Sequence, residues 1–174
     1  APAVQAPQGP GDGRQHLLPI HHLFLTEERD RHHYNQAVLL DAPADFDAAA
    51  LKAVVTALYH RHDVLRLRFD TGHDWGAAYR PLDDAMVAAS CVEETLPDTP
   101  EAITARCTHW QRGFDLARGP LMRAVYFRAP AAGAAGRLLL LVHHIIVDGV
   151  SWRVLLADVE QAYGQHRAGE PIAL

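Results

Sequence analysis

The feature that most constrains the fold is the apolar run Leu-Leu-Leu-Leu-Val at residues 138–142. A short run without any polar residue predicts a strand that is buried on both faces of a sheet. His143 and His144 follow at once, and an amphipathic pattern that begins at Ser151 predicts a helix. The two histidines and Asp148 are therefore expected at the end of a buried strand, just before a helix.

Histidine has the side-chain pKa closest to neutrality, so an imidazole at the mouth of a strand is suited to moving protons. On site chemistry alone, two adjacent histidines more often form a hydrogen-bonded structural pair than a catalytic one. Metal binding is not expected at the other pairs, His21-His22 and His32-His33, because adjacent side chains point in different directions in a helix or a strand.

The composition favours one globular domain. The chain has 174 residues, of which 49% are hydrophobic and 21% charged. A net charge of -5 without any basic cluster argues against nucleic-acid binding. No membrane span or secretion signal is indicated, so a cytoplasmic location is expected. Cys91 and Cys107 lack a Cys-x-x-Cys spacing and are interpreted as small core residues.

Hydrophobic periodicity predicts helices and strands along the rest of the chain. One helix is expected at 17–24, entered through Pro19, and another at 46–60, capped by Asp45 or Asp47. A third is expected from Thr99-Pro100 onward, with a buried face of Ile103, Cys107, Trp110 and Phe114. The last should end near His166 and bury one face formed by Trp152, Leu155, Leu156, Val159 and Tyr163. Strands are expected at 34–40, 64–69, 121–127 and 138–142, with weaker candidates at 75–81 and 87–93. This mixture predicts an α/β layered fold, although periodicity does not order the strands.

Several motifs resemble one superfamily. Residues 143–149 resemble the His-His-x-x-x-Asp-Gly signature of the chloramphenicol acetyltransferase-like superfamily, which includes the condensation and epimerization domains of nonribosomal peptide synthetases. Residues 61–69 and 114–124 resemble two further core motifs of condensation-type domains. Residues 32–40, which begin His-His-Tyr-Asn-Gln, and residues 151–153, Ser-Trp-Arg, are similar to epimerization domains in particular.

The resemblance implies a chloramphenicol acetyltransferase-like two-layer sandwich, in which helices pack on a mixed sheet, present here as a single N-terminal lobe. Residues 17–174 would form this lobe, and residues 1–16, of which 1–14 have linker composition, would follow a carrier protein domain. The chain departs from the family in reading Pro19-Ile20-His21 where Pro-Ile-Gln is common, and in being much shorter than two-lobed members. It is therefore expected to be an excised piece, or a single-lobe protein that pairs with another chain.

The implied activity is inversion at the Cα of an aminoacyl or peptidyl thioester held on the phosphopantetheine arm of a carrier protein, with no cofactor bound directly. A thioester leaves its α-proton only weakly acidic, so groups on opposite faces must remove and return a proton while donors stabilise the enolate. By resemblance His144 is the first group, and the opposing glutamate belongs to the second lobe. The isolated lobe is therefore expected to have little or no epimerase activity.

The resemblance also implies a structural partner for Asp148. The matching aspartate of the family pairs with an arginine of the core motif that residues 61–69 resemble, so Arg66 is the expected partner and Arg61 the second choice. Loss of such a buried pair would cost about 3–5 kcal/mol. Gly149 is expected to permit a tight exit from strand to helix.

The other candidate residues have smaller expected roles. His143 is expected to shape the loop, and Ser151 to support the site. Asn35, Gln36 and Trp152 are candidate substrate-side residues, although satisfying backbone groups is the simpler role for Asn35 and Gln36 and core packing for Trp152.

Two other function classes stay open. The first is an acyltransferase: either a condensation-type lobe, in which the same histidine assists amine attack on a thioester, or a trimeric enzyme like chloramphenicol acetyltransferase that completes its sites between subunits. The second is a non-catalytic lobe that docks a carrier protein. The expected partners are a carrier protein and a second lobe or partner chain; metal, nucleic acid and membrane are not expected.

Overall fold

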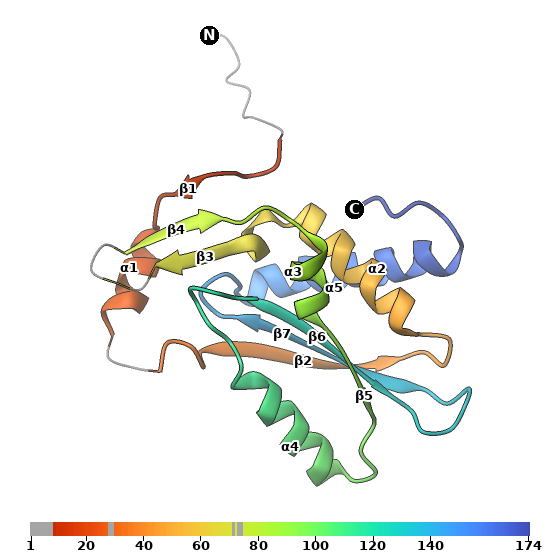
Figure 1. Cartoon of the computed structure of the whole chain (residues 1–174). Coiled ribbons are helices and arrows are strands. Elements are labelled where there is room, and N and C mark those ends of the chain that lie inside the picture. Colours follow the sequence, from red (N-terminus) through yellow and green to blue (C-terminus); the bar gives the residue numbers. More distant parts are fainter. Residues whose placement is uncertain (1–8, 28–29, 71, 73–74) are drawn as a thin grey trace.

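The strands of the chain form two sheets in the computed structural model, which describes residues 9–27, 30–70, 72 and 75–174. The larger sheet has the order β2-β7-β6-β5 (Figure 1). Its strands are β2 (Asn35–Ala42), β5 (Cys91–Thr95), β6 (Met122–Arg128) and β7 (Gly136–His143). Strand β7 is antiparallel to β2 and to β6, whereas β5 and β6 are parallel. The expected mixed sheet is confirmed.

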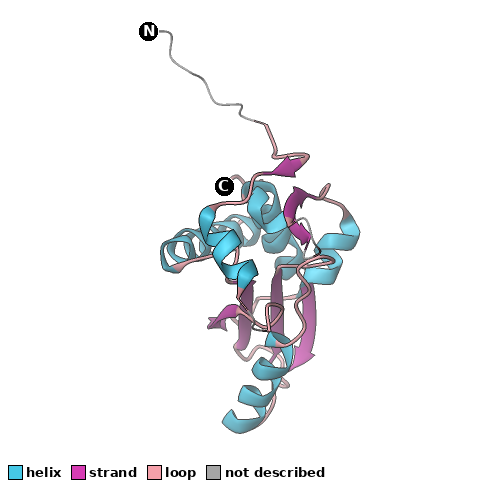
Figure 2. Ribbon diagram, turned by 90° about the vertical axis from the view of Figure 1, so that its left-hand side faces the viewer, coloured by secondary structure: helices cyan, strands magenta, loops and turns pink. Residues whose placement is uncertain are grey.

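Helices cover both faces of the larger sheet. Helices α2 (Ala48–Arg61), α3 (Asp84–Ser90) and α5 (Gly149–Arg167) lie on one side, and α4 (Pro100–Gln111) lies below the strands in Figure 1. The view in Figure 2, turned by 90°, also shows α4 apart from the other helices. The α/β layered fold predicted from the sequence is therefore confirmed. None of the helices in the described part of the chain is both long and apolar enough to cross a membrane.

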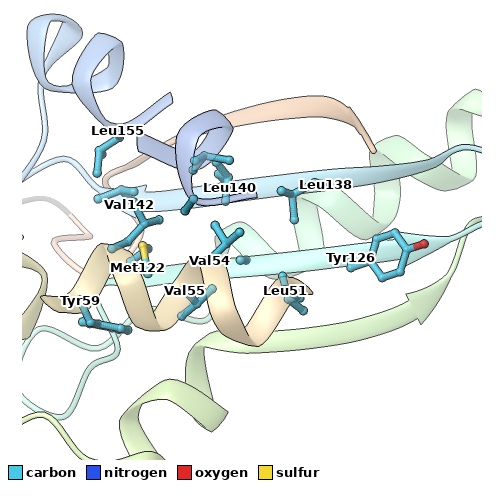
Figure 3. Close-up of a cluster of buried hydrophobic side chains, with 14 of the residues drawn as sticks. Leu51, Val54, Val55, Tyr59, Met122, Tyr126, Leu138, Leu140, Val142 and Leu155 are labelled. Carbon is cyan, nitrogen blue, oxygen red and sulfur yellow. The ribbon is translucent and has the colours of Figure 1, made fainter. Parts of the chain in front are cut away.

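The apolar run of β7 is buried because each face of the strand meets a different helix layer. Leu138, Leu140 and Val142 pack in the cluster that α2 and α5 complete (Figure 3). Leu139 and Leu141 alternate with them and pack on the α4 side, together with Val125 and Phe127 of β6. Helix α2 begins where Asp47, one of the two expected caps, accepts a hydrogen bond from the Ala50 N–H.

The smaller sheet lies beside the end of β7. It has the order β1-β4-β3, formed by Arg14–Gln15, Gly76–Tyr79 and Leu67–Asp70, and α1 (Pro19–Thr26) packs against it through Phe24 and Leu25. Residues 14–15, which the sequence assigned to a linker, thus pair with β4. The first part of that linker, residues 1–8, lies outside the described residues.

Two expected strands are only partly strands. Residues 64–69 begin with a 3₁₀ turn, Asp63–Arg66, and only Leu67–Asp70 forms β3. The turn buries Leu65 and exposes Val64, so it imitates the alternation of a strand. Residues 87–93 are the end of α3 followed by β5. Asp83 caps this seven-residue helix, which is too short to display a helical period.

The buried face expected for the helix after Thr99 is also only partly correct. Thr99 caps α4 as a helix start requires, accepting a hydrogen bond from Ala102 N–H. Ile103, Cys107 and Trp110 are only half-buried, and Phe114, which is buried, lies beyond the end of the helix. Helix α4 therefore packs on the sheet at the periphery of the core.

Candidate active site

The register of β2 against β7 sends the two adjacent histidines in different directions. Asn35 pairs with His143, and Gln36 pairs with Val142. Directly opposite side chains share a face and faces alternate along a strand, so Asn35 and His143 point to the α4 side while Gln36 and Val142 point to the α5 side. His144 extends the ladder by donating its backbone N–H to Tyr34 O at 2.9 Å, and its ring returns to the side of Gln36.

His143 is a structural residue. Its side chain is fully buried, with Phe24 and Phe114 edge-on to the ring. Nε2 donates to the Arg31 carbonyl at 2.6 Å, and Nδ1 accepts from Ile145 N–H at 3.1 Å. Burial lowers the pKa of His143 to about 4, so the ring is neutral at neutral pH. This matches the role in shaping the loop that the sequence suggested.

His144 is half-buried and its tautomer is fixed by the backbone. Nδ1 lies 2.7 Å from the Val147 carbonyl oxygen, which can only accept, so Nδ1 carries the hydrogen. Nε2 of the neutral ring is then an acceptor, and it lies 3.2 Å from Nε2 of Gln36. A neutral imidazole with an unprotonated Nε2 is the form that a general base requires.

Gln36 and Trp152 join the site through a second hydrogen bond. The indole N–H of Trp152 donates to Oε1 of Gln36 at 2.8 Å. Since an indole nitrogen is only a donor, this contact fixes the orientation of the amide and turns its NH₂ group toward His144. Trp152 is at the same time 9% exposed and part of the core between α5 and the sheet, which is the simpler role considered for it; it is not among the residues that line the groove described below.

Asn35 does not reach the site. Its amide donates to the carbonyls of His33, at 2.5 Å, and Gln111, at 2.8 Å, and so ties β2 to the end of α4. The simpler role considered for this residue, satisfying backbone groups, is the one the structure shows.

A groove of about 610 Å³ opens beside His144. Its walls are mainly apolar and come from α1, the 3₁₀ turn, the smaller sheet and the loop after β7; they include Leu18, Ile20, Leu23, Phe24, Val64, Leu67, Ile145, Ile146 and Val147. Polar groups at its edge include His21, Glu27, Asp148 and Ser151. A groove of this kind suits an elongated substrate whose reacting atom lies near an imidazole.

Tyr34 is a residue of the candidate site that the motifs did not single out. Its ring stacks on His144 with centroids 4.8 Å apart and planes 16° apart, and it also stacks with Phe24, with centroids 5.2 Å apart. The signal was present, because Tyr34 lies inside the His-His-Tyr-Asn-Gln segment. The carbonyl of Val147 was also missed, and sequence reasoning could not have found it because every residue type supplies the same oxygen.

Asp148 caps a helix and does not pair with an arginine. Its Oδ1 accepts from the N–H groups of Val150 and Ser151, at 3.1 and 2.7 Å, and from the Ser151 hydroxyl at 2.6 Å. These bonds, led by the one from the Ser151 hydroxyl, hold the pKa of Asp148 below its usual range. The aspartate is exposed, and no arginine of the described residues forms a hydrogen bond or ion pair with it; Arg66 pairs with Asp63 instead. The ion pair expected from the resemblance is therefore wrong, since α5 supplies nearer donors, although the structural role and that of Ser151 remain.

Arg66 serves another part of the fold. It is buried and donates to Asp63 at 2.5 Å, to the Arg80 carbonyl at 2.7 Å and to the Gly11 carbonyl at 2.9 Å. Arg61, the second choice, is exposed at the end of α2. Neither arginine lines the groove.

The backbone conformation at position 149 does not require a glycine. It is the first residue of α5 and is absent from the glycines with positive φ. A Cβ atom at this position would meet nothing within 4 Å. The tight turn expected here is wrong, because the strand leaves through residues 144–147 before the helix begins.

No group of three or more His, Cys, Asp or Glu residues that could hold a metal ion occurs in the described part of the chain. His21 lies on the groove and its pKa is lowered, mainly by burial. Its Nδ1 accepts from the Leu18 N–H at 3.2 Å, so this histidine fixes the start of α1.

The model of the condensation domain family matches residues 17–174. The chain belongs to the condensation domain family. The expected membership of the condensation and epimerization superfamily is thereby confirmed. Among curated relatives, this condensation-family chain is 39% identical to a linear gramicidin synthase of Brevibacillus parabrevis over 179 residues, which cover 99% of the chain and 3% of that protein. It is 34% identical to a surfactin synthase of Bacillus subtilis (strain 168), covering 99% of the chain and 5% of that protein.

Two solved structures are similar to this chain. The epimerization domain from the third module of tyrocidine synthetase B superposes with a TM-score of 0.84 at 32% identity, covering 97% of this condensation-family chain and 39% of that chain. The starter condensation domain of rhizomide synthetase superposes with a TM-score of 0.73 at 20% identity, covering 92% and 40%, which shows likeness of fold alone. The chain thus spans well under half of these structures and a small part of the curated relatives.

Proposed function

We propose that the chain is the N-terminal lobe of an epimerization domain, which inverts L to D at the Cα of an aminoacyl or peptidyl thioester. The observation that supports this most is the likeness to the tyrocidine synthetase epimerization domain, which combines 32% identity with a TM-score of 0.84 over nearly the whole chain. The substrate would be carried on the phosphopantetheine arm of a carrier protein.

His144 would act as the base. The Cα–H bond breaks, its proton passes to Nε2, and the electron pair moves onto the thioester carbonyl to give an enolate. The Nδ1–H bond to the Val147 carbonyl stabilises the imidazolium that forms. A proton must then return to the opposite face of Cα, and we assign this step to a group on a second lobe or partner chain.

A condensation-type activity is the second candidate, because the matching family model is that of the condensation domain. The same Nε2 would then take a proton from an amine as that amine attacks a thioester carbonyl. The two reactions differ in whether an acceptor amine is consumed, which makes them separable in one experiment.

The test uses the purified chain, alone and mixed with the C-terminal lobe of a related epimerization domain, together with an L-aminoacyl carrier protein. The D/L ratio of the released amino acid is measured over time, with and without an aminoacyl acceptor. We expect inversion only in the mixture, and a loss of at least about 100-fold in His144→Ala. His22→Ala, which removes an exposed histidine outside the groove, is the matched control.

Amide formation without inversion would replace the epimerase by the condensation activity. Binding of the carrier protein with neither reaction would leave only a docking role. Rapid inversion by the chain alone would contradict the need for a second lobe.

A further inference from the structure

A chain of three hydrogen bonds with one fixed polarity runs through the site. The Trp152 indole N–H donates to Gln36 Oε1 at 2.8 Å, Gln36 Nε2 donates to His144 Nε2 at 3.2 Å, and His144 Nδ1 donates to the Val147 carbonyl at 2.7 Å. The first group can only donate and the last can only accept. The Trp152 indole at one end and the Val147 carbonyl at the other therefore determine which atom donates in each of the three hydrogen bonds.

This polarity fits only one protonation state of His144. If Nε2 gained a proton, two N–H groups would face each other across 3.2 Å. Turning the Gln36 amide around would satisfy His144 but would bring its NH₂ group against the indole N–H of Trp152, which is a second clash of donors. The imidazolium therefore cannot gain a partner at Nε2 without leaving the indole against a donor, and an unsatisfied donor in a half-buried place is costly.

We propose that Gln36, oriented by the indole of Trp152, is a positioning residue that keeps His144 in the neutral form with Nε2 unprotonated and so ready to accept a proton. In the resting chain the amide occupies the Nε2 lone pair, and the substrate displaces it. After a proton has been transferred to Nε2, the same hydrogen-bond polarity favours its release from His144. The hydrogen-bond argument stands by itself, and it rests on the proposed function only in calling His144 the base.

Other ionisable groups also lie around the His144 ring, but they are the same in every variant compared below, so their effect on the His144 titration cancels. His143, adjacent in the chain, is neutral, and Tyr34 stacks on the ring. Asp148 interacts electrostatically with His144, and its carboxylate is already committed to the α5 cap. His21 and Glu27 line the same groove.

The test follows the His144 ring by ¹⁵N-resolved NMR as the pH is varied. In Gln36→Glu a carboxylate replaces the amide and can accept from both the indole and an imidazolium, so the midpoint of the His144 titration should rise by about one pH unit or more relative to the unsubstituted chain. In Trp152→Phe the amide is free to present its oxygen to His144, so the midpoint should rise in the same direction by a smaller amount. In the double variant the effect of Trp152→Phe should vanish.

Trp110→Phe is the matched control, since it removes another hydrogen-bonded indole, one that donates to Glu94 on the far side of the sheet. It should leave the His144 titration unchanged. A Trp152→Phe midpoint equal to that of Trp110→Phe would overturn the proposal, as would an unchanged or lower midpoint in Gln36→Glu. If Trp152→Phe fails to fold, Gln36→Ala decides the question, because it removes the amide donor without adding a charge at a half-buried position. Its midpoint should also rise, and an unchanged or lower midpoint would overturn the proposal.

The two proposals can fail separately. A raised titration midpoint in Trp152→Phe or Gln36→Ala, without inversion in any mixture, would remove the epimerase function and leave the positioning role of Gln36 intact. Suppose instead that inversion depends on His144 but that its titration is unchanged by substitution of Gln36 or Trp152. The epimerase function would then stand and the positioning role of Gln36 would be excluded.

Discussion

Burial gives different properties to two imidazoles that are adjacent in the chain. His143 is enclosed, neutral and bonded at both nitrogens to the backbone, and its pKa is about 4. His144 is half-buried, and its Nε2 faces an amide at the edge of a groove. The His-His motif is therefore one structural residue followed by one candidate base, and the difference follows from the alternation of a strand.

The lowered pKa of His143 makes the stability of the chain depend on pH. The unfolded ring titrates near 6.5 and the folded ring near 4, so between these values the unfolded chain binds more protons. Stability should therefore fall as the pH drops through this window, and the His143 share is about 2 kcal/mol between pH 7 and pH 5. Urea unfolding of His143→Gln should lack this share. The exposed variant His22→Gln should retain it, and equal pH dependence in the two variants would contradict the account.

Asp148 and Arg66 should behave as independent residues. The aspartate caps α5, whereas the arginine binds Asp63 and two backbone carbonyls. Asp148→Ala should lower Tm by roughly 2–4 °C through loss of the cap, and Asp148→Asn, which keeps a capping oxygen, by less.

Double-mutant cycles test this assignment. The effects of Asp148→Ala and Arg66→Met should add within error, while those of Asp63→Ala and Arg66→Met should not. A clear coupling between Asp148 and Arg66 would restore the ion pair that the family resemblance implied.

The motifs indicated residues that the structure brings together in the candidate site, but they did not predict the contacts of these residues. His144, Asp148 and Gln36 were all named from motifs, and they lie together at the end of β7. The partner of Asp148 was mistaken because a motif does not say where a side chain points. Aspartate before a helix is itself a capping signal, and it outweighs a more distant arginine.

Among the elements, β7 should contribute more to stability than its neighbour β2, because β7 is buried on both faces. Leu139 is 2% exposed, and its cross-strand partner Leu39 on edge strand β2 is 42% exposed. Leu139→Ala should reduce the free energy of unfolding by about 2–5 kcal/mol, and Leu39→Ala by less than about 1 kcal/mol. Chemical denaturation of both variants checks this. Similar losses would mean that α4 covers β2 as fully as it covers β7.

Elements with a long period or a clear cap were predictable. Helix α2 with Asp47, helix α5 and the strands β6 and β7 all lie close to where periodicity placed them. The prediction was wrong where a turn imitates alternation, at Asp63–Arg66, and where a helix is too short for a period, at Asp84–Ser90. In both places local hydrogen bonds decide the structure, and hydrophobic pattern does not report them.

For the whole molecule, the apolar rim of the groove fits the proposal of a second lobe. Leu18, Ile20 and Leu23 of the α1 region are 55%, 61% and 58% exposed around it. Periodicity did not reveal this arrangement, because it arises from the packing of the smaller sheet and α1 beside β7. The family resemblance supplied the architecture that the strand pattern left unordered.

The rim should contribute to association with a second lobe. Ile20→Asp should weaken binding of a C-terminal lobe by about tenfold or more, because it places a charge in an apolar interface. Leu39→Asp, an equally drastic change at an exposed position away from the groove, should not. Calorimetric titration measures both, and equal affinities for the two variants would exclude the rim as the contact.

The most direct test of the central claim, that Nε2 of His144 removes the Cα proton, is hydrogen exchange at Cα. The chain is incubated with an L-aminoacyl carrier protein in D₂O, alone and with a C-terminal lobe, and deuterium at Cα is followed by mass spectrometry. The account predicts deuterium entry in the two-lobe mixture that is lost in His144→Ala and kept in His22→Ala. Exchange that persists in His144→Ala, or no exchange in any mixture, would contradict it.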